Sequence, residues 1–262
     1  MKLSTAEMER YQRDGFLLFP ELFSAQEISL LRDEVERVSR IEAQGIFREG
    51  DDGQAKSMFR LHEPDGPTYS PVFRIASRTP RCLRVAQQVL GDEALYMHHL
   101  KVNMKASFQG TAWAWHLDGI AEPEMATMMV MLHDASEIGG CLYFLPGSHQ
   151  AQRVEPYFDT STTYKLWAVG PERMRELMER YPDAVAITGK AGSAAIFHCN
   201  LLHASGHNLS PRDRWQAYFC FNRCANRPTE VENPRPDYVR SRNWEPMALV
   251  NDDGILALAE TA

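Results

Sequence analysis

The sequence predicts a mainly β fold with flanking helices, organised around a double-stranded β-helix (jelly roll) core. Between residues 94 and 222 the chain consists of short apolar segments separated by turn signals, which is typical of double-sheet β domains. The clearest helical patterns come before this region. With 262 residues, 44% of them hydrophobic, the chain can bury one large core. We therefore expect a single domain with a helical cover over residues 1–92, a jelly-roll core over 93–224 and a C-terminal segment, 225–262, that wraps the core.

The N-terminal part shows three helix patterns and one short strand pattern. Ser24-Ala-Gln-Glu is a capping box that opens a helix. Residues 15–20 are apolar and short, which favours a strand. Residues 41–69 are rich in Gly, Asp and Glu and lack periodicity, so they are predicted to form a long loop. The predicted helices cover residues 4–14, with Ser4 or Thr5 as N-cap, the stretch that follows Ser24, and residues 79–90, which Gly91 ends.

The core region shows strand patterns with one helix inserted among them. The Gly139-Gly140 pair marks one of the turns. Pro171 stands at the first turn of an amphipathic, charged stretch and predicts a helix that ends near Arg180. The predicted strands cover residues 94–107, 111–118, 125–132, 141–145, 192–198, 201–204 and 215–222.

Charge and cysteine content argue against several classes of protein. A formal net charge of −7 argues against binding to nucleic acid or to an anionic membrane, since both require a basic surface. The chain starts with charged residues where a signal peptide would be apolar, and its longest apolar run, residues 125–132, is too short to span a bilayer. Five scattered cysteines without a Cys-x-x-Cys motif indicate neither a disulfide framework nor a zinc ribbon. We expect a cytoplasmic monomer or homodimer whose partner is a small molecule.

The segment from Trp115 to Gly119 places an imidazole and a carboxylate two positions apart. Successive side chains of a strand alternate between its faces, so His116 and Asp118 project from the same side. With a third ligand, they would form the two-His-one-carboxylate arrangement of non-haem Fe(II) oxygenases. The spacing alone also occurs by chance, in surface turns or in hydrogen-bonded pairs of a core. A metal site therefore requires a third ligand elsewhere in the chain.

His203 is the best candidate for that third ligand. It lies on a predicted strand near the end of the core region, and Arg214 follows eleven residues later at the start of an apolar strand. This spacing allows a turn and a returning strand, which would bring the guanidinium alongside the metal. His207 is the main rival, although it is only seven residues from Arg214. Roles in packing, in a turn or in orienting the site are expected for His98, His133, His149 and His198.

Arg214 and Ser205 indicate a carboxylate-binding group beside the metal. A guanidinium binds a carboxylate through two parallel hydrogen bonds, which suits a buried anion site. Ser205 lies two positions after His203, on the same face of an extended chain, and its hydroxyl can add a further hydrogen bond. A metal next to a carboxylate-binding group implies a chelating anionic co-substrate such as a 2-oxo diacid.

As a set, these motifs resemble the phytanoyl-CoA dioxygenase family of Fe(II)/2-oxoglutarate-dependent oxygenases. The central pattern is His116-x-Asp118 followed by His203-x-Ser205 and Arg214. The resemblance covers nearly the whole chain, and it is greatest to the bacterial branch that holds ectoine hydroxylase and the hydroxylases of free amino acids such as leucine. The matching blocks begin at Tyr11, Lys101, Trp113, Gly140, Gly189, Phe197 and Pro234.

The resemblance implies an enzyme that hydroxylates an unactivated C–H bond of a small molecule. His116, Asp118 and His203 would be the catalytic residues that hold Fe(II), with 2-oxoglutarate and O2 as co-substrates. Related halogenases lack the carboxylate ligand, so Asp118 favours hydroxylation over halogenation. The best guess for the substrate is a free amino acid or an amino-acid derivative.

The resemblance also implies which residues bind the co-substrate. Arg214 and Ser205 would bind the distal carboxylate of 2-oxoglutarate. Asn103 would contact the co-substrate as the Asn of the matching family block does. His99 stands where the family often has Gln, and it is a further candidate for contact with the co-substrate.

One departure from the family leaves the substrate open. After Asp118 the branch usually carries a longer aromatic and acidic segment, whereas the segment from Gly119 onward is short here and lacks the aromatic residues. Because that segment helps define the substrate of ectoine hydroxylase, its absence argues against ectoine. The alternative is a tailoring oxygenase of a carrier-bound, CoA-linked or terpenoid/polyketide natural-product intermediate. The alternative of another class is a non-catalytic metal-binding jelly-roll protein, and the intact ligand set together with Arg214 counts against it.

Overall fold

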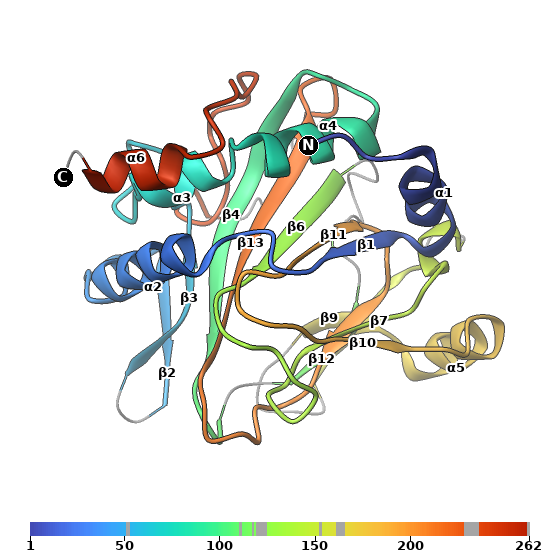
Figure 1. Ribbon diagram of the computed structural model, residues 1–262. Helices are drawn as coiled ribbons and strands as arrows, with labels where there is room; N and C mark the ends of the chain where they lie inside the picture. The colour runs from blue at the N-terminus through green and yellow to red at the C-terminus, as the bar shows by residue number, and fades with distance from the viewer. Residues whose placement is uncertain are drawn as a thin grey trace.

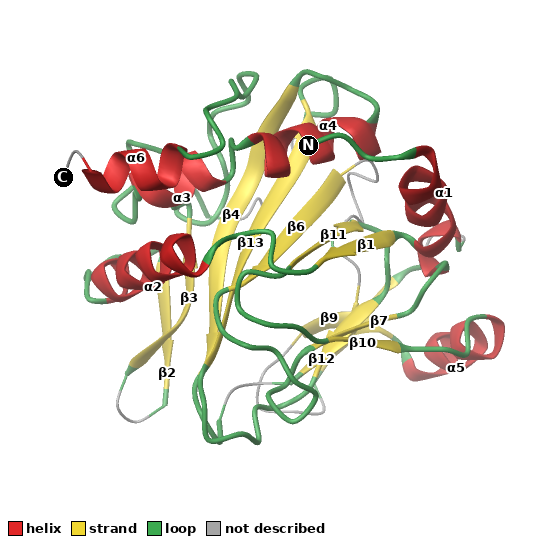
Figure 2. Ribbon diagram, viewed as in Figure 1, coloured by secondary structure: helices red, strands yellow, loops and turns green. Residues whose placement is uncertain are grey.

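The computed structural model describes residues 1–50, 53–109, 112–116, 118, 125–151, 154–160, 166–227 and 236–260. In this part of the chain, two antiparallel sheets form the centre of the molecule and helices pack against the larger one (Figures 1 and 2). The arrangement agrees with the mainly β, double-sheet architecture that the sequence predicts.

Strands from distant parts of the chain alternate in both sheets, and all their described pairings are antiparallel. The large sheet has the order β1 (Phe16–Phe19), β11 (Ala194–His198), β6 (Met125–Met131), β13 (Arg214–Arg223), β4 (Leu95–Lys105), β3 (Gln54–Phe59) and β2 (Ile46–Glu49). The small sheet has the order β10 (Val185–Ile187), β7 (Leu142–Phe144), β12 (His203–Ser205) and β5 (Trp113–His116). The strands β8 (Pro156–Asp159) and β9 (Leu166–Val169) form a separate hairpin.

The first, second and fourth helices begin or end where local sequence signals predict. Capping boxes at Ser4 and Ser24 open the first two helices, and Gly91 ends the fourth with a left-handed φ of 64°. None of the helices in the described ranges is both long and apolar enough to cross a membrane. Their bounds are α1 (Thr5–Asp14), α2 (Ala25–Ser39), α3 (Pro71–Ala76), α4 (Pro80–Leu90), α5 (Pro171–Arg180) and α6 (Gly254–Glu260).

Alternation along the strands sorts apolar side chains between two cores. On β6, Ala126, Met128 and Val130 belong to the core beneath the helices, whereas Met129 and Met131 belong to the core between the two sheets. All seven residues of β6 are therefore buried. Three methionines of this strand, Met128, Met129 and Met131, thus contribute to these two cores.

Two apolar clusters hold the small sheet in place. One lies between the sheets and includes Phe144 of β7 and Tyr218 of β13. The other includes Leu177 of α5 and Leu202, just before β12, and the partly buried Trp115 of β5 packs against it. These contacts help to position β5 and β12, the strands that carry the predicted metal ligands.

The prediction of a long loop over residues 41–69 is wrong, because β2 and β3 lie within it. The two strands pair with each other, and β3 also pairs with β4. Ile46 and Met58 are paired and buried, whereas the other residues of β2 remain partly or fully exposed. So few apolar residues give no alternating pattern, and pairing with a distant strand stabilises β3.

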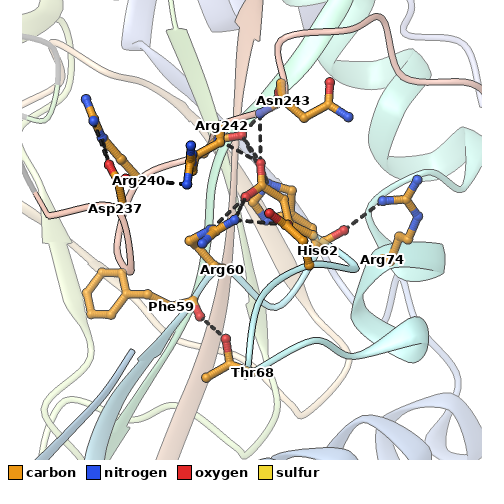
Figure 3. A network of polar contacts seen from close by, with 12 residues as sticks. Phe59, Arg60, His62, Thr68, Arg74, Asp237, Arg240, Arg242 and Asn243 are labelled. Atoms are coloured by element: carbon orange, nitrogen blue, oxygen red, sulfur yellow. Dashed lines mark hydrogen bonds and ion pairs between the residues drawn. The ribbon is translucent and has the colours of Figure 1, made fainter. Parts of the chain in front are cut away.

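A buried polar network attaches the C-terminal segment to the residues just after β3 (Figure 3). The Glu63 carboxylate accepts hydrogen bonds from the Ser241 hydroxyl (2.6 Å) and from the backbone N–H groups of Arg242 (2.8 Å) and Asn243 (2.9 Å). The Arg60 side chain donates to the other oxygen of this carboxylate (2.6 Å). A charged group in this position is stabilised by many short hydrogen bonds, and the C-terminal segment supplies most of them.

Candidate active site

Two strands of the small sheet bring the predicted metal ligands together. His116 ends β5 and His203 begins β12, and these residues lie directly opposite each other in the ladder. Their ring centroids are 4.1 Å apart. Asp118 follows two residues after His116, and one of its carboxylate oxygens lies 3.8 Å from Nε2 of His203. One potential ligand atom from each residue lies within 4.8 Å of the others, so the three side chains form a compact group.

The backbone orients both imidazoles of this group. Nδ1 of His116 lies 2.8 Å from the carbonyl oxygen of Ala114, and Nδ1 of His203 lies 2.9 Å from that of Leu201. A carbonyl oxygen only accepts hydrogen bonds, so we assign the proton of each ring to Nδ1. Each Nε2 then keeps a lone pair for a metal ion.

Local electrostatics keep the group in a form that binds metal. Burial, assisted by the neighbouring His203, lowers the pKa of His116 to about 3, so this imidazole is neutral at neutral pH. Burial alone would raise the pKa of Asp118, but His203 and Lys101 lower it well below its ordinary value. The backbone N–H of Asp118 donates to the Cys199 carbonyl (2.8 Å) and holds the residue in place. Asp118 is thus ionised at neutral pH.

This donor set fits a divalent iron ion. Two imidazole nitrogens and one carboxylate oxygen bind one side of such an ion and leave the other positions for co-substrates. Across the described ranges, no other set of three His, Cys, Asp or Glu side chains comes equally close together. The rival ligand His207 is not part of this group, and the ring of His198 instead lies 5.3 Å from that of His149.

Arg214, the first residue of β13, is buried between the sheets with an exposed fraction of 2%. Its guanidinium donates to the Gly140 carbonyl (3.0 Å) and to the side-chain oxygen of Gln216. Its Nε has no hydrogen-bond partner in the part of the chain that the structure describes. Burial lowers the pKa of Arg214, which reflects the cost of keeping this charge away from water. An anionic ligand would offset that cost.

Lys105 lies beside Arg214 and is not among the residues that the sequence predicts for the site. The two residues are paired across the β4–β13 ladder. The side-chain nitrogen of Lys105 donates to the Ser205 hydroxyl (2.9 Å) and to the Gly206 carbonyl. Lys105, Ser205 and Arg214 therefore converge at one end of the space between the sheets. A signal was available, because Lys105 lies two positions after Asn103 and shares its face of the strand.

Asn103 and His99, the other predicted co-substrate contacts, lie on the same face of β4 as Lys105. Asn103 is paired with Gln216, and its side-chain oxygen accepts from the Ser57 hydroxyl (2.9 Å). His99 is buried. The contact of both residues with a co-substrate stays a prediction.

Lys101 brings a cation close to the metal group from the large sheet. Its ammonium lies 5.2 Å from the ring centroid of Tyr218. Its positive charge helps to lower the pKa of Asp118. Lys101 begins one of the blocks that match the family, but no role was predicted for it.

The segment that sets this sequence apart from ectoine hydroxylase, residues 119–124, lies outside the described residues, as does Pro234 at the start of the last matching block. The geometry of the site therefore comes from β4, β5, β12 and β13 together with Asp118.

Comparisons of the sequence with known proteins identify a family and several relatives. The family described as phytanoyl-CoA dioxygenase (PhyH) matches residues 11–215. Ectoine dioxygenase of Bordetella bronchiseptica is 31% identical over 261 residues, which cover 92% of this chain and 83% of that protein. L-Proline trans-4-hydroxylase of Streptomyces griseoviridis is 29% identical over 262 residues, which cover 93% of this chain and 95% of that protein.

Solved structures confirm the jelly-roll prediction. Crystal structures of EctD from S. alaskensis with bound Fe and with 2-oxoglutarate and 5-hydroxyectoine both match with a TM-score of 0.79. Their sequences are 26% and 28% identical to this chain over the matched regions, and each match covers 95% of this chain and 88% of EctD.

Proposed function

The chain belongs to the phytanoyl-CoA dioxygenase family, and on this premise we propose that it uses Fe(II), 2-oxoglutarate and O2 to hydroxylate a free amino acid or a compact amino-acid derivative. The observation that carries this proposal is the compact group of His116, Asp118 and His203. Arg214 supports it, because a buried guanidinium with an unpaired Nε suits the distal carboxylate of 2-oxoglutarate. A non-catalytic metal-binding protein would have no use for such an arginine.

The chain's own residues have separable tasks in this reaction. Bound Fe(II), with O2 and 2-oxoglutarate, supplies the oxidation of a C–H bond to C–OH, while 2-oxoglutarate is converted to succinate and CO2. His116 and His203 would hold the ion through Nε2, and Asp118 through its carboxylate. Phe144 and Phe197 lie beside His203, with ring centroids 6.4 Å and 5.3 Å from it, and exclude water from this side of the site.

Lys101 supports an amino acid as the substrate. Its ammonium lies near the metal group and can pair with a substrate carboxylate, which would orient the rest of the molecule relative to the iron. The relatives named ectoine dioxygenase and L-proline trans-4-hydroxylase carry names of small compounds of this class. The substrate is therefore expected to bear a carboxylate on a short skeleton.

Succinate formation across a panel of substrates tests the proposal. The panel contains L-proline, L-leucine, ectoine, an acyl-CoA and a terpenoid acid, each supplied with Fe(II), 2-oxoglutarate and O2. A free amino acid or derivative should give succinate and a product heavier by one oxygen atom, and His203→Ala should give neither. Turnover confined to CoA-linked or terpenoid compounds would contradict the proposed substrate class. A protein that binds neither iron nor 2-oxoglutarate would contradict the proposal as a whole.

A further inference from the structure

Two buried cations lie side by side where the distal carboxylate of 2-oxoglutarate is proposed to bind. Lys105 and Arg214 are paired across the β4–β13 ladder, and their exposed fractions are 5% and 2%. In the described part of the chain, neither forms an ion pair with a carboxylate, and their hydrogen bonds go to neutral groups, which for Arg214 include Tyr218. Two like charges in a poorly hydrated space repel each other. One of them is therefore expected to lose its charge, and only the lysine can do so at ordinary pH.

The other titratable groups around Lys105 do not supply the missing negative charge. Lys56 and Glu49, on β3 and β2, form an ion pair with each other at 2.7 Å, so their charges largely cancel. Cys141 contributes a thiol whose pKa is raised by burial, and it is uncharged at neutral pH. The remaining charged neighbour is Arg214 itself. The surroundings of Lys105 are therefore positive overall.

These surroundings favour the neutral amine when no ligand is present. Burial, followed by the charge of Arg214, lowers the pKa of Lys105 to about 6. A neutral amine has two N–H groups, which match the two observed acceptors, the Ser205 hydroxyl oxygen and the Gly206 carbonyl. Because the Ser205 oxygen accepts from Lys105, the Ser205 O–H is free to donate to a ligand.

We propose that Lys105 is a second cationic group for the distal carboxylate of 2-oxoglutarate, and that it takes up one proton from the solvent when the co-substrate binds. The inference rests on the proposed function, because it takes 2-oxoglutarate as the occupant of this space. The arriving carboxylate carries one negative charge, and the proton on Lys105 balances it. Arg214, Ser205 and the ammonium form of Lys105 then all donate to the same carboxylate.

Proton uptake gives the affinity for 2-oxoglutarate a definite pH dependence. The pKa of Lys105 is lower in the free protein than in the complex, so the complex binds more protons. The affinity is then highest below the free pKa of about 6 and falls as the pH rises toward the pKa of the complex. With one proton taken up, the affinity for 2-oxoglutarate falls by at most about tenfold per pH unit. A site with Arg214 alone shows no such slope, because its guanidinium stays protonated.

Calorimetry measures this proton uptake directly. The Fe(II)-loaded protein is titrated anaerobically with 2-oxoglutarate at one pH in two buffers of different ionisation enthalpy, and the difference in heat gives the number of protons taken up. 2-Oxopentanoate is the matched ligand, since a methyl group replaces the distal carboxylate. Lys105→Met removes the amine and keeps a long side chain. Lys190→Met is the matched control, because Lys190 is an exposed lysine that pairs with Asp134 (3.2 Å).

The expected result is an uptake of about half to one proton with 2-oxoglutarate above neutral pH, in the unmodified protein and in Lys190→Met. No uptake is expected with 2-oxopentanoate or in Lys105→Met, whose affinity should also lose its pH slope. Normal binding of 2-oxoglutarate without proton uptake would overturn the inference, and so would an uptake that persists in Lys105→Met. Binding without proton uptake is measured on the unmodified protein, so this test does not depend on whether Lys105→Met folds. A protein that does not bind 2-oxoglutarate at all would contradict the proposed function itself.

Discussion

His116 and His203 acquire the same orientation from the same local geometry, although they lie on different strands. In each case Nδ1 donates to the carbonyl oxygen two residues earlier in the chain. The hydrogen bond selects the tautomer and fixes the ring, so both Nε2 atoms are set toward Asp118 before a metal ion arrives. The backbone thus orients both rings, and neither Nδ1 depends on a carboxylate for its hydrogen bond.

Arg214 offers a direct test of the distal-carboxylate site at the level of one residue. We expect Arg214→Lys to raise the KM for 2-oxoglutarate because a lysine cannot donate two parallel hydrogen bonds. A loss of about 2 kcal/mol corresponds to a roughly 30-fold weaker affinity. Initial rates at varied 2-oxoglutarate would measure it. Arg212→Lys, at an exposed position two residues earlier, serves as the control, and equal KM values in the two variants would contradict the assignment.

Lys101 allows the substrate side of the site to be tested separately. We expect Lys101→Met to raise the KM for the amino-acid substrate at least about tenfold, since a partner for its carboxylate is lost. The affinity for 2-oxoglutarate should stay nearly unchanged, because Lys101 is paired with Tyr218 in the middle of β13, whereas Arg214 begins that strand. Lys101→Arg should restore part of the substrate affinity. A variant with an unchanged substrate KM would show that Lys101 does not contact the substrate.

Among the structural elements, the turn before β7 contacts the proposed co-substrate site through its backbone. Gly140 has a φ of 69°, and a Cβ there would lie 2.7 Å from the carbonyl oxygens of Gly206 and His207. We expect Gly140→Ala to move the turn and its carbonyl, which accepts from Arg214. The Kd for 2-oxoglutarate, measured by calorimetry, should rise at least about tenfold. Gly170→Ala is the control, since a Cβ there meets only ordinary contacts with Tyr157, and a similar Kd in both variants would refute this role of the turn.

The network around Glu63 stabilises the contact of the C-terminal segment with the rest of the fold. Glu63→Gln replaces an acceptor of several hydrogen bonds with an amide and leaves Arg60 without its buried partner. We expect the free energy of unfolding, measured in urea, to fall by about 3–5 kcal/mol. Asp237→Asn breaks an exposed pair with Arg240, and should change it by less than about 1 kcal/mol.

The same network predicts a response to acid. Burial alone would raise the pKa of Glu63, but hydrogen bonds from Ser241 and other neighbours lower it below its ordinary value of 4.5. The folded state therefore binds this proton less readily than the unfolded state, and its stability is lost as the pH falls below 4.5 through the lowered pKa. Glu63→Gln should lose less stability over that range, and an equally steep loss would contradict this account of the network.

The elements that could be predicted are those with local signals. Capping residues and glycine stops marked α1, α2 and α4, and turn residues marked β6 and β7. The strands β2 and β3 could not be predicted because they contain few apolar residues and depend on pairing with β4. Helix α6 was not expected either, since it is short and lies against α2 and α3.

At the scale of the whole molecule, the site depends on local sequence patterns and also on strand pairings that local patterns do not encode. The two-residue period of a strand suggested the grouping of His116 with Asp118 from the sequence alone, although β5 ends at His116 and Asp118 lies just beyond the strand. The direct pairing of His203 with His116 depends on the topology of the small sheet. The approach of Lys105 to Arg214 depends on the register of β4 with β13, and this is why the lysine was missed.

The absorption spectrum of the anaerobic protein with Fe(II) and 2-oxoglutarate tests the central claim most directly. If His116, Asp118 and His203 hold iron that 2-oxoglutarate chelates, a weak visible charge-transfer band should appear when both are added. His203→Ala should abolish the band, whereas His207→Ala, which removes the rival histidine, should retain it. The account would be contradicted by the absence of the band from the unmodified protein, or by a full band in His203→Ala.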